Sequence, residues 1–314
     1  MEYRVLGKTG IKVSLVSLGS GGTRQLGQNS KMSQKSQTTL IRRALNLGIN
    51  MIDTAAQYGN SESIIGKALQ GVSRENYFLC TKWYSPITIH PVESPKLILK
   101  SIENSLSKLA ISYIDVMMFH GPLHGEYKDI INICYPVLNS LRQQGKIRFI
   151  GLSTRFVMDP QQIVAEVALK TNPELFDVVM LKYGILNQYA SKIIMPLAIK
   201  NNIGIMNMAV IREKLPNLRL LEQLIRKWKN KGLISKDSLE AKNPLGWLVK
   251  DEVDSIISAG YKFAADHPAV STVITGTADV KHLESNVNAL TKPRLPFNHT
   301  EKLNNLFDGI IEYV

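Results

Sequence analysis

Four side chains that can hold or move protons follow successive stretches predicted to be buried strands. Asp53 ends one such stretch and Tyr58 lies five residues further on, while Lys82 and His120 end the next two. An ammonium group within roughly 4 to 6 Å of a phenol favours the phenolate and lowers the pKa of the phenol, and a carboxylate keeps that ammonium charged. Taken alone, each residue has an ordinary structural explanation, such as a helix cap or a surface lysine. Together they predict a site for proton transfer.

These side chains can meet only if their strands end at one rim. From residue 38 onward, strand-like stretches alternate with helix-periodic ones, which is typical of a parallel sheet built from β/α units. Eight strands are expected, at 16–18, 50–53, 77–81, 113–119, 146–152, 177–181, 203–208 and 271–275. Eight helices are expected after them, at 38–47, 61–69, 95–109, 129–143, 160–169, 190–200, 250–266 and 280–290. The count predicts a (β/α)8 TIM barrel, whose functional residues lie at the carboxyl ends of the strands.

The remaining segments are expected to extend the barrel without forming a second domain. Gly7-Lys8-Thr9-Gly10 separates two short strand-like stretches and predicts an N-terminal β-hairpin that closes one mouth of the barrel. A helix near 300–312 forms a C-terminal helical appendage, and residues 210 to about 246 form an irregular basic insertion. We therefore expect a single domain over residues 1–314.

A doubly wound nucleotide-binding sheet is the rival architecture. It is suggested by Gly19-Ser20-Gly21-Gly22 after a predicted strand. The position that needs the last glycine of that motif holds Arg24, and no helix follows directly. The barrel is the better prediction.

The net charge of +12 reflects 38 Lys and Arg residues against 26 Asp and Glu residues. Half of this excess lies between Arg212 and Lys236, which hold eight basic and two acidic residues. We interpret the segment as a solvated helix face, because no helix-turn-helix, RNP or zinc-finger spacing accompanies the charge. No nucleic acid partner is therefore expected.

The composition also predicts a cytoplasmic protein. The start Met1-Glu2-Tyr3-Arg4 lacks the apolar stretch of a secretory signal, and Cys80 and Cys134 are too few for a disulfide framework. Apolar runs such as 178–181 are far shorter than the roughly 18 to 20 residues that span a bilayer. We expect no membrane association.

Two other kinds of site are not favoured. His120 and His124 are four residues apart, but Gly121-Pro122 prevents a shared helix face, and no acid or cysteine completes a metal set. The stretch Gly151 to Arg155 around Ser153 lacks the second glycine of a hydrolase nucleophile elbow. The sequence predicts neither a metal site nor a hydrolase.

Further motifs accompany the four polar residues from residue 3 to about 290. They are Tyr3 to Gly10, Ile52-Asp53-Thr54-Ala55 with Tyr58-Gly59, Thr81-Lys82, Tyr113-Ile114-Asp115 leading to His120, Gly145-Lys146-Ile147-Arg148, and Gly276 with Leu283 and Asn286. As a set these motifs resemble those of the aldo-keto reductase family. The resemblance implies a barrel enzyme that uses a nicotinamide dinucleotide, and it places the catalytic tetrad of the family on Asp53, Tyr58, Lys82 and His120.

The chemistry of these residues suits the reduction of a carbonyl. The reaction needs a proton on oxygen as well as a hydride on carbon, and the cofactor supplies only the hydride. We expect Tyr58 to donate the proton, Lys82 and Asp53 to tune it, and neutral His120 to orient the carbonyl oxygen. The expected partner is a small carbonyl or alcohol compound. The alternatives are a sugar (lactol) 1-dehydrogenase and, from another class, a cofactor-binding regulatory subunit with negligible turnover.

The resemblance also places the cofactor. It implies that Ser153, Thr154 and Met208 lie at the nicotinamide, while Met180 replaces a glutamine and cannot form the amide hydrogen bond of that residue. The loops with Trp83-Tyr84-Ser85, Trp228 and Trp247 are expected to select the substrate.

The adenine side is implied at the end of the last strand and the start of the next helix, at Gly276, Thr277, Lys281, His282 and Asn286. Gly276 and His282 replace basic residues of many relatives, and Asp279, expected to cap the helix, adds negative charge. The backbone amides of the helix start and Lys281 favour a phosphate. We expect NADP(H), with NAD(H) as the alternative.

Overall fold

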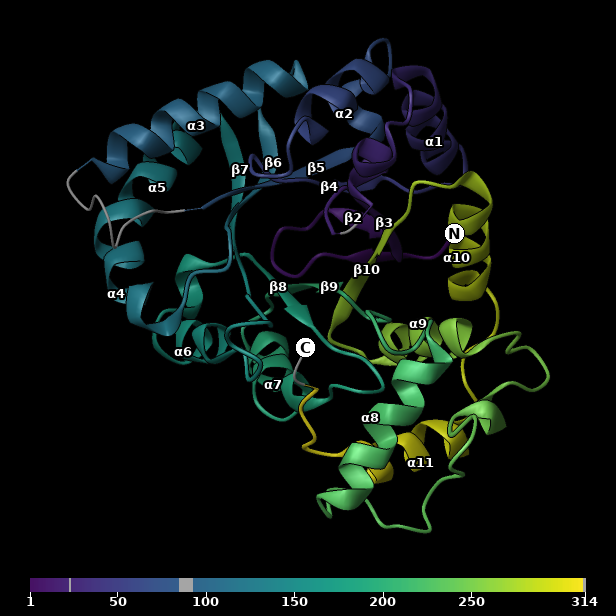
Figure 1. Cartoon of the computed structure of the whole chain (residues 1–314). Coiled ribbons are helices and arrows are strands. Elements are labelled where there is room, and N and C mark those ends of the chain that lie inside the picture. Colours follow the sequence, from purple (N-terminus) through teal and green to yellow (C-terminus); the bar gives the residue numbers. More distant parts are fainter. Residues whose placement is uncertain (23, 85–92, 313–314) are drawn as a thin grey trace.

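The chain forms a closed barrel of parallel strands surrounded by helices (Figure 1). In this computed structural model the described residues are 1–22, 24–84 and 93–312. Strands β3 to β9 follow one another around the barrel, and β10 pairs with both β9 and β3 to close it. The strands are Val16–Gly19 (β3), Met51–Asp53 (β4), Phe78–Trp83 (β5), Ile114–Phe119 (β6), Ile147–Ser153 (β7), Val178–Lys182 (β8), Gly204–Met208 (β9) and Val270–Gly276 (β10). The predicted (β/α)8 fold is confirmed.

Side chains alternate along the strands between the barrel interior and the helix layer. The interior is filled by apolar side chains with almost no exposure, among them Met51, Cys80, Val116, Met118, Met180 and Met206. Two residues further along β4, β5 and β8 stand Asp53, Lys82 and Lys182, whose side chains therefore point inward at the carboxyl ends. The core fills the middle of the barrel and leaves the carboxyl rim to polar groups.

Helices cover the outer face of the barrel (Figure 1). Ile98, Ile102 and Leu109 recur at helical spacing on α3 and are buried, as their periodicity predicts. The helices are Gln34–Asn46 (α1), Ser61–Leu69 (α2), Ser94–Leu109 (α3), Tyr127–Asp129 (α4), Tyr135–Gln143 (α5), Ile163–Thr171 (α6), Ile194–Lys200 (α7), Leu218–Asn230 (α8), Ile256–Asp266 (α9), Val280–Thr291 (α10) and Phe297–Phe307 (α11).

The predicted N-terminal hairpin closes the amino end of the barrel. Its strands Tyr3–Val5 (β1) and Lys12–Ser14 (β2) are antiparallel, and Leu6 between them packs among the interior side chains. Gly7 has a φ of +52°, and a Cβ there would lie 2.2 Å from the amide nitrogen of Gly204 at the start of β9. Only glycine lets the hairpin approach the barrel this closely.

The segment expected to be irregular contains a full helix, so that expectation is wrong. α8 buries Leu221, Ile225 and Trp228 at helical spacing. Trp228 is 3% exposed, and its ring lies 5.6 Å from that of Phe307 on α11. Trp228 is therefore a packing residue and does not line a substrate loop.

Other helix ends differ from the prediction by a few residues. α6 begins at 163 instead of 160, because the carboxylate of Asp159 accepts hydrogen bonds from the N–H groups of Ile163 and Val164. Ser61 is the first residue of α2, as predicted, and its hydroxyl donates to the carbonyl oxygen of Ser20 at 3.3 Å. α9 begins at 256 and α11 ends at 307, both inside the expected ranges.

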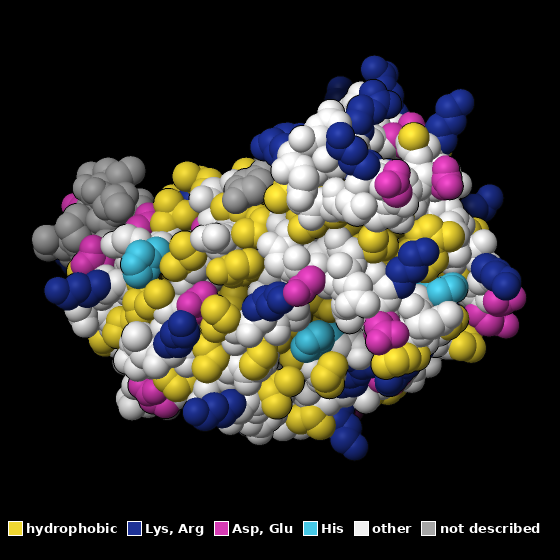
Figure 2. Space-filling view, turned by 90° about the horizontal axis from the view of Figure 1, so that it is seen from below, with side chains coloured by type: hydrophobic (Ala, Val, Ile, Leu, Met, Phe, Trp, Pro, Cys, Tyr) yellow, Lys and Arg dark blue, Asp and Glu magenta, His cyan; other side chains and the backbone are white. Residues whose placement is uncertain are grey.

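The basic residues of α8 lie on its solvent side, where Arg219, Arg226 and Lys227 are exposed. Figure 2 shows Lys and Arg side chains gathered on a raised part of one face, with acidic and hydrophobic side chains interspersed over the rest. The interpretation of 212–236 as a solvated face is thus confirmed for α8. Across the described ranges, none of the helices is both long and apolar enough to cross a membrane.

Candidate active site

Asp53 and Lys82 form a buried ion pair at the carboxyl ends of neighbouring strands β4 and β5. Lys82 Nζ lies 2.5 Å from Asp53 Oδ1 and donates a second hydrogen bond of 2.8 Å to the carbonyl oxygen of Thr54. The side chains are 1% and 6% exposed. Removing one partner would leave a buried charge without compensation, at a cost of about 3 to 5 kcal/mol.

Tyr58 and His120 complete the group beside this pair. Lys82 Nζ lies 5.1 Å from the centre of the Tyr58 ring, and the Tyr58 hydroxyl is 3.5 Å from His120 Nε2. The two rings meet edge to face, with centroids 5.5 Å apart. His120 directly follows β6, and its backbone N–H donates to the carbonyl oxygen of Trp83 at the end of β5. The structure brings together all four residues predicted for proton transfer.

Gly21, in the loop after β3, lies against the Tyr58 ring. A Cβ at this position would be 2.6 Å from Cε2 and 3.0 Å from the hydroxyl of Tyr58. Any larger residue would therefore displace the phenol. In the sequence this glycine belongs only to the disfavoured nucleotide-binding motif, and no local pattern predicts its contact with Tyr58.

Burial and ion pairing shift the pKa values of Asp53 and Lys82 in opposite directions. Burial raises the pKa of Asp53, and Lys82 offsets only part of this effect. Burial alone would lower the pKa of Lys82, but Asp53, with smaller contributions from Tyr58 and Cys80, raises it above its ordinary value. Lys82 is therefore protonated at neutral pH.

Burial also shifts the pKa values of Tyr58 and His120, the two side chains that could donate a hydrogen bond to a ligand. Burial raises the pKa of Tyr58 above its ordinary value, and the Lys82 ammonium offsets only part of the rise. The expectation that Lys82 brings this pKa below the ordinary value is wrong, because desolvation outweighs the charge. Burial, reinforced by Lys82 and Arg155, lowers the pKa of His120 to about 3. At neutral pH the phenol keeps its proton and the imidazole is uncharged.

Ser153 and Thr154 lie at the end of β7 as predicted, but their hydroxyls already bind protein groups. Ser153 Oγ accepts from the N–H of Gly121 at 2.9 Å and donates to the carbonyl oxygen of Phe119 at 3.3 Å. Thr154 Oγ1 donates to Gln162 Oε1 at 2.8 Å. Each hydroxyl retains acceptor capacity but has no proton left to donate.

Met180 and Met208 differ in their surroundings. Met180 is 2% exposed among the interior side chains of the barrel, whereas Met208 is partly exposed at the last position of β9. In register, Met180 lies beside Ser153 and Met208 beside Lys182. Met208 is thus a rim residue and Met180 a core residue.

The start of α10 is capped by the chain itself. Asp279 Oδ1 accepts from the N–H of His282 at 3.0 Å, as predicted for an N-cap, and Thr277 Oγ1 accepts from the N–H of Asp279. Hydrogen bonds from the backbone, chiefly that of His282, lower the pKa of Asp279. A backbone amide that a phosphate could use therefore already binds a carboxylate. Gly276, Lys281 and His282 are exposed around this helix start, and Asn286 lies further along α10.

Three buried polar atoms on the rim make no hydrogen bond within the described part of the chain: His120 Nδ1, Ser20 Oγ and Thr54 Oγ1. Ser20 follows β3 and Thr54 follows β4, so they flank the Asp53 end of the rim. Because unpaired buried polar groups are costly, these atoms suit a polar ligand. Within the same described ranges, no three His, Cys, Asp or Glu side chains are grouped so as to hold a metal ion.

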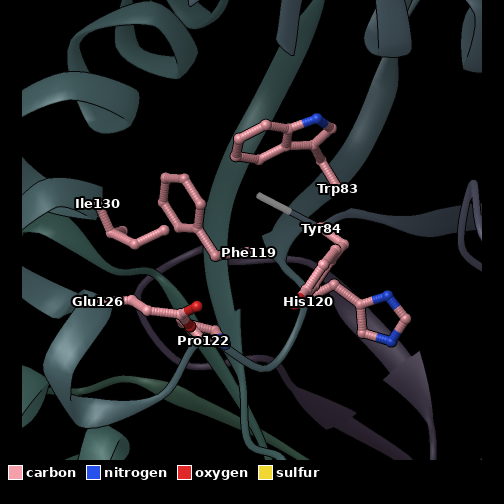
Figure 3. A pocket seen from close by; sticks show the side chains of 7 residues that line it. All are labelled: Trp83, Tyr84, Phe119, His120, Pro122, Glu126 and Ile130. Carbon is pink, nitrogen blue, oxygen red and sulfur yellow. The ribbon is translucent and has the colours of Figure 1, made fainter. Parts of the chain in front are cut away.

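A small cavity of about 10 Å³ lies behind the rim, lined in part by Trp83, Phe119 and Ile130. Figure 3 shows these apolar side chains together, with the imidazole of His120 pointing away from them. Trp83 and Phe119 belong to the apolar cluster between barrel and helices. The cavity is a packing gap outside the barrel wall, below the roughly 300 Å³ typical of ligand pockets. Ser85, expected in the adjoining loop, lies outside the described residues.

Lys182 and Glu312 are buried polar residues at the mouth formed by the carboxyl ends of the strands, and neither was predicted as a site residue from the sequence. Lys182 ends β8, and its Nζ lies 2.6 Å from Glu312 Oε2. The inward alternation of Met180 and Lys182 could have identified the lysine. No local spacing links it to a residue 130 positions away.

The sequence matches the model of the Aldo/keto reductase family over residues 17–306. Together with the closed barrel and the four clustered residues, this match shows that the chain belongs to the aldo-keto reductase family of oxidoreductases, whose members use nicotinamide cofactors.

Two curated relatives and one solved structure illustrate the similarity. The chain is 28% identical over 301 residues to L-galactose dehydrogenase of Arabidopsis thaliana, covering 93% of this chain and 89% of that protein. It is 31% identical over 222 residues to the NADH-specific methylglyoxal reductase of Escherichia coli (strain K12), covering 65% of each. An aldo-keto reductase from Bacillus halodurans in its holo form superposes with a TM-score of 0.71 at 23% identity, covering 100% of this chain and 97% of that one.

Proposed function

We propose that the chain is a nicotinamide-dependent carbonyl reductase or alcohol dehydrogenase. The observation that carries the proposal is the distance of 3.5 Å between the Tyr58 hydroxyl and His120 Nε2, beside the buried Lys82–Asp53 pair. Two donors this close can both hydrogen-bond to one carbonyl oxygen.

Tyr58 is the proposed general acid in reduction and general base in oxidation. Because burial raises its pKa, the phenol holds its proton until a basic oxygen forms next to it. Lys82 stabilises the phenolate that remains, and this interaction gains strength only as the proton leaves. Asp53 keeps Lys82 charged and oriented.

His120 positions the carbonyl oxygen as a neutral donor. With a pKa of about 3 it stays uncharged at every physiological pH. An uncharged imidazole can polarise the carbonyl without placing a second cation beside Lys82. The cofactor, when bound, supplies or accepts the hydride.

The proposed cofactor site follows the rim from β7 to α10. Ser153 and Thr154 offer acceptor lone pairs to a carboxamide N–H, and Met208 offers a polarisable side chain to a flat ring. The unpaired Ser20 and Thr54 hydroxyls support a polar ligand at the same mouth. On the adenine side the proposed residues are Gly276, Thr277, Lys281, His282 and Asn286.

We propose NADP(H) as the cofactor, with NAD(H) as a usable alternative. Lys281 and His282 are exposed and free to approach a 2′-phosphate, but Asp279 places a carboxylate at the same helix start. We therefore expect discrimination of at most about 10- to 100-fold. The name of the Escherichia coli relative, an NADH-specific reductase, supports keeping the alternative.

A sugar 1-dehydrogenase is the second candidate. It is favoured by the similarity to an L-galactose dehydrogenase along almost the whole chain. The same proton-transfer group serves both reactions, so the geometry does not separate them. A regulatory subunit without turnover is disfavoured, because a buried ion pair beside a paired phenol and imidazole is costly to keep without chemistry.

An activity screen tests the proposal. The purified chain is assayed with NADPH and NADH against methylglyoxal, aromatic aldehydes and ketones, and with NADP⁺ and NAD⁺ against alcohols and aldoses. Turnover of an aldehyde or ketone supports the proposal, and turnover of aldoses alone supports the second candidate. Binding of dinucleotide without turnover of any compound would contradict both.

A further inference from the structure

Lys182 and Glu312 form a second buried ion pair at the catalytic mouth, separate from the group around Tyr58. Lys182 ends β8 and points into the barrel, continuing the inward series that includes Met180. Its Nζ donates to Glu312 Oε2 at 2.6 Å, and the side chains are 3% and 1% exposed. Gln162 Nε2 donates to the carbonyl oxygen of Lys182 at 2.9 Å, and Gln162 Oε1 accepts from the Lys182 N–H at 2.7 Å, which holds this end of β8 in place.

This pair lies near the proposed reaction site. Only β7 separates β8 from β6, and His120 directly follows β6. Neighbouring strands are about 4.8 Å apart, so the backbones of β6 and β8 are roughly 10 Å apart. In register, Lys182 lies beside Met208, the rim residue proposed for the cofactor. A ligand held by Tyr58 and His120 can therefore reach the Lys182 side chain.

Further cations surround Glu312. Lys214 Nζ lies 3.1 Å from Glu312 Oε1, and Arg212 lies 5.7 Å from the centre of the Phe156 ring, which Lys182 approaches to 4.9 Å. Among the described residues, Glu312 is the carboxylate that both lysines contact. Arg212 pairs with Glu213 at 3.3 Å, so the Glu312 carboxylate faces two lysines beside an arginine that has its own carboxylate partner.

The second oxygen of the Glu312 carboxylate, Oε1, is held less well than the first. Within the described part of the chain, Glu312 Oε1 makes no hydrogen bond although it lies at ion-pair distance from Lys214. Burial lowers the pKa of Lys182, Glu312 opposes this effect, and Lys214 and Arg212 reinforce it. The two lysines thus share the Glu312 carboxylate.

Anchoring of the C-terminal segment does not require this carboxylate. Phe307 and Ile310 are buried in the main apolar cluster, and Lys192 pairs with Asp308 at 2.5 Å. Replacing a buried ion pair by apolar residues is often neutral or stabilising. Stability therefore does not explain a buried lysine at the mouth of the barrel.

We propose that Lys182 and Lys214 form an anion-binding subsite of the catalytic mouth, which Glu312 occupies until an anionic group of a ligand takes its place. The chemistry recognised is a carboxylate or phosphate oxygen, the kind of group that Glu312 already presents. It comes either from a carboxylate on the carbonyl substrate or from a phosphate of the dinucleotide. The inference deepens the proposed function and depends on it only for the role of the bound anion.

Binding of small anions tests the subsite without catalysis. Succinate and inorganic pyrophosphate are titrated calorimetrically into the full chain, its Glu312→Gln variant and the Glu312→Gln/Lys182→Met double variant. Glu312→Gln keeps the shape of the side chain and frees the lysines, so we expect affinity to rise about tenfold, the effect of one charge-assisted hydrogen bond. The double variant should lose this gain. Glu301→Gln removes the same charge from an exposed position of α11 and serves as the control.

The two probes separate the sources of the anion. A gain with succinate assigns the subsite to a substrate carboxylate, and a gain with pyrophosphate alone assigns it to the dinucleotide. No gain with either probe, or an equal gain in Glu301→Gln, overturns the proposal.

A catalytic comparison then separates the subsite from the proposed function. 4-Oxobutanoate and butanal share a four-carbon aldehyde, and only the former carries a carboxylate. If succinate binding has assigned the subsite to the substrate, Glu312→Gln should raise the ratio of kcat/KM for 4-oxobutanoate to kcat/KM for butanal about tenfold. An equal change for both aldehydes would overturn the substrate assignment. Failure of all carbonyl substrates would contradict the proposed function, while the calorimetry still decides the subsite.

Discussion

Two opposing effects determine the pKa of Tyr58. Desolvation favours the neutral phenol, and Lys82, 5.1 Å from the ring centre, favours the phenolate. In this structure desolvation is the stronger, so the hydroxyl is an acid that releases its proton only to a strongly basic acceptor. An alkoxide forming in a water-poor site is such an acceptor.

Lys82→Met tests this balance. Without the ammonium, the pKa of Tyr58 rises further, because burial is no longer opposed. In the pH profile of kcat for reduction, the limb that falls as Tyr58 loses its proton should move to higher pH, and the rate at pH 7 should fall. Lys12→Met, on the exposed side of the hairpin, is the matched control. An unmoved profile would mean that Lys82 does not act on Tyr58.

The low pKa of His120 makes the free energy of unfolding depend on pH. Its pKa is about 3 in the folded chain against 6.5 in an ordinary site, so below pH 6.5 the unfolded chain binds a proton that the folded chain does not. Stability from this residue is therefore present at pH 7 and is lost as the pH falls. Between pH 7 and pH 5 the loss is about 2 kcal/mol.

Urea unfolding of the wild type and of His120→Asn at both pH values measures this loss. The wild type should lose about 2 kcal/mol more than the variant, while other titrating groups, including His267, cancel in the comparison. An equal loss in both proteins would contradict the neutral state of His120.

At the scale of elements, the start of α10 decides how well a phosphate can bind. Asp279→Ser keeps an N-cap and removes the charge, so affinity for NADP⁺ should rise about tenfold while that for NAD⁺ changes little. Fluorescence titration with each dinucleotide gives the two affinities. Asp237→Ser, at an exposed position outside α10, controls for net charge. A rise for both dinucleotides, or for neither, would contradict a phosphate site beside Asp279.

Helices and strands were predictable where one periodicity covers a whole element. The spacing of Ile98, Ile102 and Leu109 predicts α3, whereas the bounds of α8 were not predicted although Leu221, Ile225 and Trp228 lie at helical spacing. Dense charge in that segment obscures its apolar face. Helix starts were missed where a side chain ahead of the helix, such as Asp159, determines the first turn.

The candidate site was predictable as far as strand order places it. Residues at successive strand ends share a rim in any closed parallel barrel, so the meeting of Asp53, Lys82 and His120 follows from the fold class. Contacts between distant loops do not follow from it. Gly21 against Tyr58 and Glu312 against Lys182 depend on tertiary packing that no local pattern records.

At the scale of the whole molecule, we propose that residues 1–314 form one domain that includes the basic insertion. Leu224 and Trp228 of α8 share an apolar cluster with Val179 of β8, Ile205 of β9 and Phe307 of α11. A shared core predicts one cooperative transition. Unfolding followed by far-UV circular dichroism and by tryptophan fluorescence should give coincident curves, since Trp83 reports on the barrel wall and Trp228 on α8. An earlier fluorescence transition, abolished by Trp228→Phe, would show that the insertion unfolds separately.

The central claim, that Tyr58 is the proton donor, is tested most directly by Tyr58→Phe. The substitution removes one hydroxyl and keeps the ring that packs against Gly21 and faces Lys82. With the best substrate from the activity screen, kcat should fall by about 10² to 10⁴, the usual contribution of general acid catalysis, while dinucleotide affinity stays within about twofold. A variant that turns over at nearly the wild-type rate would contradict the assignment of proton transfer to Tyr58.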